Sequence, residues 1–192
     1  MSLHLLLVRH GESTWNAARR WQGQADPPLS PLGMRQARAA VTCVPAGYEH
    51  VVASDLERAR RTGELLADGL GLSFAVEPRL RERYAGPWQG LTRAEIEAGW
   101  PGMLDDGRRP DDYEPDATLL ERALEALDVG STPTIVVTHG GVIRVIERHL
   151  GFAATRIPNL SALPIDRTAD GLAAGARIGL AGDGAVAAEA GG

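Results

Sequence analysis

The sequence contains no lysine, and all 20 of its basic side chains are arginines. This absence excludes the P-loop type of nucleotide site, which needs a lysine on the phosphates. It also excludes a Schiff base with a substrate carbonyl or with pyridoxal phosphate. Arginine presents a planar pair of donors that matches the oxygens of a phosphate, which lysine cannot do. The composition therefore suits a site that binds phosphate through arginine.

Cysteine is almost absent as well. Cys43 is the only cysteine, so the chain can form neither an intrachain disulfide nor a thiolate metal cluster. We interpret Cys43 as a small buried apolar residue rather than a reactive thiol. The histidine patterns His-Glu-x-x-His and His-x-His, which are typical of metal sites, are missing too. Metal-assisted chemistry stays an alternative, because histidines far apart in the sequence can still meet in space.

Long apolar runs are also missing. No stretch reaches membrane-spanning length, and the apolar run at the N-terminus is too short for a signal peptide. The net charge of -5 gives no electrostatic reason to expect nucleic-acid binding. The length of 192 residues is typical of one domain with a substantial core. We therefore expect one domain over residues 1–180 in the cytosol, followed by a disordered tail rich in Ala and Gly over residues 181–192.

Apolar periodicity and capping residues predict an α/β order of elements. Short apolar runs predict strands at residues 3–8, 50–53, 73–76 and 134–138, and edge strands at residues 163–167 and 174–180. Helical spacing predicts helices at residues 13–20, 31–44, 92–99, 116–128 and 142–150, and one that follows residue 55 and ends near residues 69–71. The helix-start signals are Ser30 before Pro31, a capping box from Thr92 to Glu95, and Asp116. Residues 100–115 form either a substrate lid or an ordinary surface loop.

Two of the apolar runs end in a His-Gly pair. Residues 3–8 lead into Arg9 and His10, and residues 134–138 lead into His139, with a glycine after each histidine. In open α/β sheets, ligands bind beyond the carboxyl ends of the strands. Each histidine alone would pass for an ordinary loop residue, but two such junctions can meet at one edge of a sheet. We therefore predict that His10 and His139 share a site.

The two junctions belong to a longer set of motifs, which read Arg-His-Gly-Glu-Ser, Ser-Asp-Leu-Glu-Arg-Ala, Leu-Arg-Glu with Gly-Pro-Trp-Gln-Gly, and Thr-His-Gly-Gly. In chain order these are residues 9–13 with Asn16, residues 54–59 with Thr62, residues 80–82 with residues 86–90, and residues 138–141. The set resembles the signature of the histidine phosphatase superfamily, in its phosphoglycerate-mutase-like branch 1. The resemblance covers residues 3 to about 150. It implies a three-layer α/β/α sandwich with a mostly parallel central sheet.

The resemblance implies five catalytic residues, which are His10, Arg9, Arg58, Glu82 and His139. His10 would attack the phosphorus and form a covalent phosphohistidine, while the other basic residues of this set neutralise the phosphoryl oxygens. We expect the arginines to lower the pKa of His10 and to keep its attacking nitrogen neutral. By the same resemblance, the reaction needs no metal and no organic cofactor.

Glu82 would act as the general acid. Phosphoryl transfer to an imidazole expels an alkoxide, which is a poor leaving group and needs a proton. Burial and a neighbouring phosphate both favour the protonated form of a carboxyl group. Glu82 would then activate the water that hydrolyses the phosphohistidine. By composition alone Glu82 would be a surface glutamate between Arg81 and Arg83, so the resemblance decides its role.

The resemblance also implies substrate-binding candidates, which are Asn16, Gln22, Gly23, Ser54 and Gly140. Three of them have simpler alternatives. Asn16 could cap a turn and Gly23 could be a turn residue, while Gln22 could be an ordinary solvated loop side chain. As partners we expect a small phosphorylated substrate, no nucleic acid and no membrane, with a homodimer as one option.

The connection between the second and third motifs bears on the type of reaction. Residues 63–79 pass directly from a helix to a strand, without the long insertion that cofactor-dependent mutases of the family generally carry. The chain also has no lysine to bind a carboxylate. We therefore predict a phosphatase that hydrolyses small phosphomonoesters, with a phosphoglycerate mutase and a non-catalytic phospho-ligand binding protein as alternatives. Residues 114–117 depart from the Gly-Glu-Ser that many phosphatase-like members have at this place, which leaves the substrate open.

Overall fold

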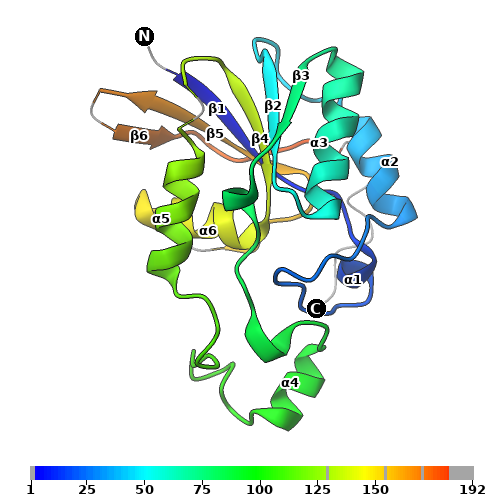
Figure 1. Cartoon of the computed structure of the whole chain (residues 1–192), viewed down its shortest axis with the longest axis vertical. Coiled ribbons are helices and arrows are strands. Elements are labelled where there is room, and N and C mark those ends of the chain that lie inside the picture. Colours follow the sequence, from blue (N-terminus) through cyan, green and yellow to red (C-terminus); the bar gives the residue numbers. More distant parts are fainter. Residues whose placement is uncertain (1–2, 129, 154, 170, 182–192) are drawn as a thin grey trace.

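A seven-stranded sheet forms the centre of the computed structural model, which describes residues 3–128, 130–153, 155–169 and 171–181 (Figure 1). The strands are β1 (Leu3–Arg9), β2 (His50–Ala53), β3 (Ser73–Val76), β4 (Thr134–Thr138), β5 (Ser161–Thr168), β6 (Gly171–Ala174) and β7 (Ile178–Gly179). Their order is β3-β2-β4-β1-β5-β6, and β7 pairs with the start of β5. The predicted tail lies outside the described residues, apart from residue 181.

The strands of this sheet are mostly parallel. Parallel ladders join β3, β2, β4 and β1, whereas β5 runs antiparallel to β1, β6 and β7. This arrangement confirms the predicted fold class. The prediction of an edge strand at residues 163–167 is wrong, because β5 has β1 on one side and β6 with β7 on the other. The strand predicted at residues 174–180 is divided between the end of β6 and β7.

Pro164 shows how β5 fits inside the sheet. Proline cannot donate to a ladder and is normally confined to edges or to breaks in the pairing. In β5 it pairs with Leu6 of β1, and its carbonyl accepts a hydrogen bond from the Gly175 N–H at 2.9 Å. Gly175 directly follows β6, at the break between β6 and β7. The missing N–H of Pro164 therefore lies on the side of β5 that faces the break between β6 and β7.

Helices cover both faces of the sheet (Figure 1). The helices α2 (Pro31–Ala40) and α3 (Glu57–Leu70) pack on one face, and α5 (Asp116–Ala126) and α6 (Gly140–His149) pack on the other. Alternate residues of β1 point to the two cores, with Leu6 and Val8 on the α2–α3 side and Leu5 and Leu7 on the α5–α6 side. This confirms the three-layer sandwich. The short elements are α1 (Thr14–Ala17), α4 (Arg93–Gly99) and the 3-10 turns η1 (Pro78–Leu80) and η2 (Gly86–Trp88).

Two of the three predicted helix starts are confirmed. Ser30 caps α2, and Thr92 forms a reciprocal capping box with Glu95 at the start of α4. The third prediction is wrong, because Pro115 is the N-cap of α5 and Asp116 is its first helical residue. The carboxylate of Asp116 pairs with two arginines instead of with the helix end.

Three helices end two or more residues earlier than predicted, and among them α5 differs least, since it ends at Ala126 instead of residue 128. The helix α1 stops at Ala17, and Arg19 shortly after it has a left-handed φ of 54°. The helix α2 stops at Ala40, because residues 41–44 form a turn in which the Cys43 N–H donates to the Ala40 carbonyl at 2.9 Å. This turn leaves Cys43 exposed, so the prediction of a buried Cys43 is wrong.

Some predictions about the chain as a whole are left open by the fold. Within the described residues, no helix combines the length and the apolar character needed to cross a membrane. Residues 100–115 consist of turns and irregular backbone, and their role as a lid stays a prediction. The single domain and the cytosolic location stay predictions as well.

The loop after β1 rests on the first turn of α2. An ideal Cβ built on Gly33 would lie 1.9 Å from the carbonyl oxygen of Glu12, which also accepts a hydrogen bond from the Ser30 N–H at 2.9 Å. We predict that Gly33→Ala lowers the free energy of unfolding by about 1–3 kcal/mol, because backbone atoms must shift to admit the methyl group. Urea unfolding followed by circular dichroism measures the change.

Gly99→Ala is the matched control for this substitution. Gly99 is also helical, but nothing lies within 4 Å of its ideal Cβ. Alanine should leave the free energy of unfolding unchanged there, or raise it by up to about 1 kcal/mol through helix propensity. Equal stabilities of the two variants would show that the loop after β1 does not rest on α2.

Candidate active site

His10 follows β1 at the carboxyl edge of the parallel strands and is buried. Its backbone N–H donates to the Thr138 carbonyl at 3.0 Å, which ties it to the end of β4. On the ring, Nδ1 donates to the Gly11 carbonyl at 2.6 Å, and Nε2 accepts a hydrogen bond from Arg58 Nε at 3.3 Å. Because Nδ1 holds the proton, Nε2 keeps its lone pair, and this is the form of imidazole that acts as a nucleophile.

The surroundings of His10 keep its ring uncharged. Burial lowers the pKa of His10 well below the ordinary value of 6.5, and the positive charges of Arg58 and Arg9 lower it further. The hydrogen bond to the Gly11 carbonyl raises the pKa, but by less. The sequence predicts the effect of the arginines, whereas the larger effect of burial becomes visible only in the fold.

Arg58 lies in the first turn of α3 and is fully buried. Besides its bond to His10, it donates from Nη1 to the Ala25 carbonyl and from Nη2 to the Gly23 carbonyl, both at 2.8 Å. Burial lowers the pKa of Arg58 to about 10, although the negative charge of Glu82 opposes this shift. The guanidinium is therefore still charged at neutral pH, and the loop that precedes α2 fixes it beside His10.

His139 follows β4 as the N-cap of α6 and is fully buried. The centre of its ring lies 5.1 Å from that of His10, with an interplanar angle of 61°. Nε2 is hydrogen-bonded to Ser54 Oγ at 2.9 Å, while Nδ1 is buried without a hydrogen-bond partner within the described residues. Burial and the charge of Arg58 lower the pKa of His139 well below the ordinary value of 6.5. Ser54 therefore orients the ring and leaves Nδ1 available to a bound ligand.

Arg9 and Gly140 meet at the junction of β1 and α6. Arg9 is the last residue of β1, and its Nη1 donates to the Ile157 carbonyl. Gly140 begins α6, and an ideal Cβ on it would lie 3.6 Å from Arg9 Nε. The absence of a side chain on Gly140 thus keeps the space beside this guanidinium open, next to a helix N-terminus that favours anions.

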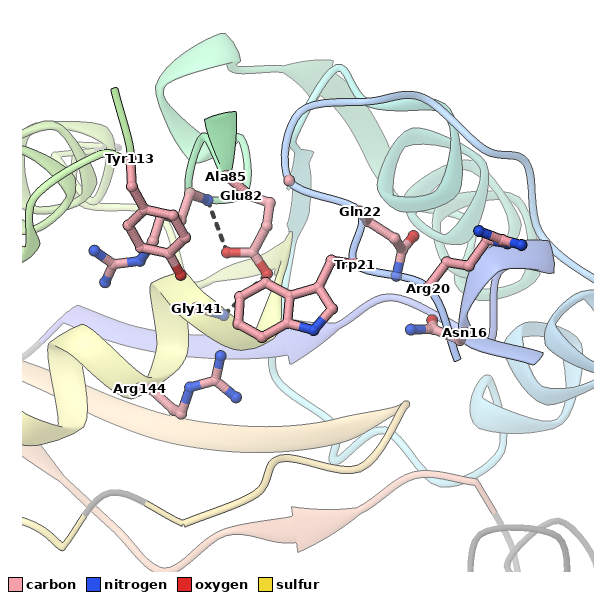
Figure 2. Close-up of a pocket in the computed structure, with 11 residues that line it drawn as sticks. Asn16, Arg20, Trp21, Gln22, Glu82, Ala85, Tyr113, Gly141 and Arg144 are labelled. Carbon is pink, nitrogen blue, oxygen red and sulfur yellow. Dashed lines mark hydrogen bonds between the residues drawn. The ribbon is translucent and has the colours of Figure 1, made fainter. Parts of the chain in front are cut away.

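Glu82 lies across from the histidines, shortly after η1. Its Oε1 accepts the Arg83 N–H at 2.8 Å, and its Oε2 accepts the Gly141 N–H at 3.0 Å. An ideal Cβ on Gly141 would lie 2.1 Å from Glu82 Oε1, so a larger residue would displace the carboxylate. Glu82 lines a cavity of about 220 Å³, which we call the inner cavity. Figure 2 shows its carboxylate between Tyr113 and Trp21.

The predicted substrate-binding residues fall into two groups. Asn16, Gln22 and Gly23 line the inner cavity, whereas Ser54 and Gly140 lie beside the histidine and arginine side chains and not on the cavity wall. The other residues that line the inner cavity are Arg20, Trp21, Glu82, Arg83, Ala85, Tyr113, Gly141 and Arg144. The aromatic side chains and Arg144 were not among the residues that the sequence indicated.

Asn159 is a site residue that sequence reasoning missed. Its Nδ2 donates to the His10 carbonyl at 2.8 Å and to Asn16 Oδ1 at 3.3 Å. Asn16 Oδ1 also accepts the Ser13 N–H at 3.1 Å within the capping box of α1, so Asn16 helps to cap this helix, and its role in substrate binding stays a prediction. Asn159 lies just before β5, where the apolar pattern of the sequence is weak, and only the fold brings it to the loop after β1.

Arg122 is a second missed residue, and it holds the segment that carries Glu82. From α5 its guanidinium donates to the carbonyls of Arg79 and Arg81, both at 2.6 Å, and to the Glu82 carbonyl at 3.1 Å. It also contacts both carboxylate oxygens of Glu114, at 2.7 and 2.8 Å. An arginine on an amphipathic helix usually faces solvent, so the sequence gives no signal for this role.

All five predicted catalytic residues lie in one part of the structure. Arg58 donates to Nε2 of His10, and the His139 ring lies beside the His10 ring. The charge of Arg9 acts on both histidines, and the charge of Glu82 acts on Arg58. Such donors suit a tetrahedral dianion placed next to a nucleophile. In the part of the chain that the structure describes, no three His, Cys, Asp or Glu side chains are grouped as metal ligands.

Comparisons with known proteins agree on the family and differ in the activities they name. The chain matches the family described as histidine phosphatase superfamily (branch 1) over residues 5–169. A Cronobacter sakazakii protein named probable phosphoglycerate mutase GpmB is 36% identical, and the match covers 94% of this chain and 93% of that protein. The structure named Mycobacterial hydrolase 1 has a TM-score of 0.82 at 28% identity, covering 92% of this chain and 98% of that one. A mycobacterial glucosyl-3-phosphoglycerate phosphatase with VO3 has a TM-score of 0.77 at 29% identity, covering 90% and 96%.

The histidine rings give the first prediction from this site. At pH 6 we expect ¹⁵N NMR to show His10 and His139 uncharged, with the proton of His10 on Nδ1, because both pKa values are lowered. In urea-unfolded protein the same rings should titrate near about 6.5. Arg9→Gln should raise the pKa of His10, because it removes one positive charge. A His10 ring that gains its proton at or above pH 6.5 in the folded protein would contradict the assignment.

The second prediction concerns the support of Glu82. Arg122→Gln should speed amide hydrogen exchange at Leu80 and Arg81 by about tenfold or more, because the hydrogen bonds that hold this segment are lost. Arg167→Gln is the control, since Arg167 lies beside the start of β1 and, within the described residues, pairs only with the exposed Asp128. Unchanged exchange in Arg122→Gln would mean that η1 holds the segment without Arg122.

Proposed function

The chain belongs to branch 1 of the histidine phosphatase superfamily, and from this membership we propose that it hydrolyses small phosphomonoesters through a covalent phosphohistidine on His10. Members of this family act on phosphate esters, and this chain is such an enzyme. The observation that carries the proposal is the state of His10, a buried and uncharged imidazole whose Nε2 lone pair meets a guanidinium donor. That combination suits attack on an anionic phosphorus centre.

In the first half of the reaction, Nε2 of His10 forms a bond to phosphorus while the ester P–O bond breaks. Arg58 Nε, which donates to Nε2 in the free enzyme, loses this acceptor and donates to a phosphoryl oxygen instead. The ring of His10 then carries a positive charge, and the hydrogen bond from its Nδ1 to the Gly11 carbonyl stabilises that charge.

The remaining site residues balance the charges of this step. Arg9 and the Nδ1 of His139 face the other phosphoryl oxygens. In the substrate complex Glu82 serves as the general acid and gives a proton to the oxygen that leaves, so the alcohol departs neutral and Glu82 is left as a carboxylate.

In the second half, water takes the place of the alcohol in the inner cavity. Glu82 removes a proton from the water as its oxygen bonds to phosphorus, and the P–N bond breaks with its electron pair returning to Nε2 of His10. Phosphate leaves, and Glu82 is again the acid. The cycle consumes one water, and it uses neither a metal nor an organic cofactor.

The short connection between α3 and Glu82 favours hydrolysis of the phosphohistidine over transfer of its phosphoryl group to a second organic substrate. The chain passes from α3 through β3 and η1 directly to Glu82, with no further element between them. Glu82 itself is half-buried, so water reaches its carboxyl group. A phosphoglycerate mutase is the second candidate, which the name of the Cronobacter sakazakii relative favours. Binding of phosphorylated ligands without turnover is the third, and the complete set of site residues argues against it.

We propose that residues 1–180 form one catalytic domain, that it works in the cytosol, and that its substrate is a small phosphorylated molecule rather than a nucleic acid or a membrane. Asn16, Gln22 and Gly23 would contact the leaving group from the cavity wall. A homodimer stays an option.

Phosphate release from p-nitrophenyl phosphate, with EDTA present, tests the chemistry. We expect the wild-type protein to release phosphate and His10→Ala to lose at least about a thousandfold in rate, because the covalent route needs Nε2. His149→Ala is the matched control, since His149 lies exposed at the other end of α6 and should keep full activity.

Three results would count against hydrolysis by His10. Loss of activity in EDTA would point to a metal, and activity that persists in His10→Ala would point to another nucleophile. Interconversion of phosphoglycerates faster than phosphate release would make the protein a mutase.

A further inference from the structure

A second cavity adjoins the inner one, and we call it the outer cavity. Its volume is about 460 Å³, and the residues that it shares with the inner cavity include Trp21 and Tyr113. The arginines in its wall are Arg83, Arg109, Arg144 and Arg148. This concentration of positive charge is local, because the chain as a whole has a net charge of -5.

Two of these arginines share one carboxylate. Arg83 and Arg148 both pair with Asp116, at 2.5 and 2.7 Å. Glu114, the other acidic residue of the wall, pairs with Arg122 at 2.7 Å. No carboxylate of the outer cavity wall therefore remains for a further arginine.

Arg144 has no such partner. It is half-buried on α6, and its side chain forms no hydrogen bond or ion pair with any residue in the described ranges. Figure 2 shows it extending from α6 toward the Trp21 ring. Arg109 adds a second positive charge to the outer cavity, where it lies over the Tyr113 ring at 5.6 Å.

A half-buried guanidinium stays charged and needs acceptors, so leaving it without an anion is unfavourable. Arg144 lines both cavities, and an anion bound there would lie where the inner cavity opens into the outer one. We propose that the substrate carries a second anionic group, a carboxylate or a second phosphate, and that Arg144 binds it. This inference rests on the proposed function, and it narrows the substrate class.

The second anion is distinct from the phosphate that is transferred. His10 and Arg58 line neither cavity, so the reacting phosphoryl group lies deeper than the cavity wall. The leaving group crosses the inner cavity along the surface formed by Trp21 and Tyr113, whose ring centres lie 6.5 Å apart in an edge-to-face contact, and its far end reaches Arg144. Arg144 is thus a specificity residue that touches the leaving group.

Three esters with the same three-carbon chain test this assignment. They are propyl phosphate, the phosphate ester of 3-hydroxypropanoate, and 1,3-propanediol bisphosphate. Isothermal titration calorimetry on His10→Ala measures their binding without turnover. We expect at least one of the two esters with a second anion to bind about tenfold or more tightly than propyl phosphate, because it gains a charged hydrogen bond. The preferred end group tells whether the second anion is a carboxylate or a phosphate.

Arg144→Gln in the same background should abolish this preference and leave the binding of propyl phosphate unchanged. Arg35→Gln is the control, because Arg35 is exposed on α2, and it should keep the preference. Equal binding of all three esters overturns the inference. So does an Arg144→Gln variant that weakens all three alike, since Arg144 would then contact the transferred phosphate. A binding preference without phosphate release by the wild-type protein counts against the proposed function and leaves the inference standing.

Discussion

The register of β1 against β4 is the constraint on which the site depends. The last pair of this parallel ladder is Arg9 with Thr138, so His10 and His139 follow at the same level of the sheet. A slip of one residue would turn every side chain of β1 to the opposite face and exchange the contents of the two cores. Leu5 to Val8 are fully buried on both faces, which makes such a slip costly. Burial of these apolar residues therefore fixes the distance between the two histidines.

Burial in the site removes the charge of His10 but not that of Arg58. Burial lowers the pKa of His10 and that of Arg58 alike. The histidine starts from an ordinary value near neutrality and so loses its charge, whereas Arg58 at about 10 keeps its own. Carbonyls of the loop that precedes α2 supply the acceptors that a buried guanidinium needs. Burial thus produces an uncharged imidazole beside a charged guanidinium.

Different parts of this arrangement were predictable from the sequence to different degrees. His10 and His139 could be predicted from apolar runs alone, because parallel strands end at the same edge. The roles of Arg58 and Glu82 came from the family resemblance, since a charged residue in a helix or loop normally indicates solvent. Arg122 could not be predicted, because its partners are largely backbone carbonyls, which every residue has. The interior position of β5 was missed for a related reason, as its pairing with β1 spans most of the chain and has no local signature.

In the proposed mechanism, the hydrogen bond from Arg58 to His10 would give the nucleophile a chemical selectivity of its own. In the resting protein it occupies the one lone pair through which the ring could react. An acyl or alkyl electrophile that took this lone pair would leave a buried donor with nothing to bind, which is unfavourable. A phosphoryl group brings replacement acceptors on its own oxygens. The hydrogen bond from Arg58 therefore makes His10 less reactive toward acyl and alkyl electrophiles. A phosphate ester can react because its anionic oxygens take over the hydrogen bond from Arg58.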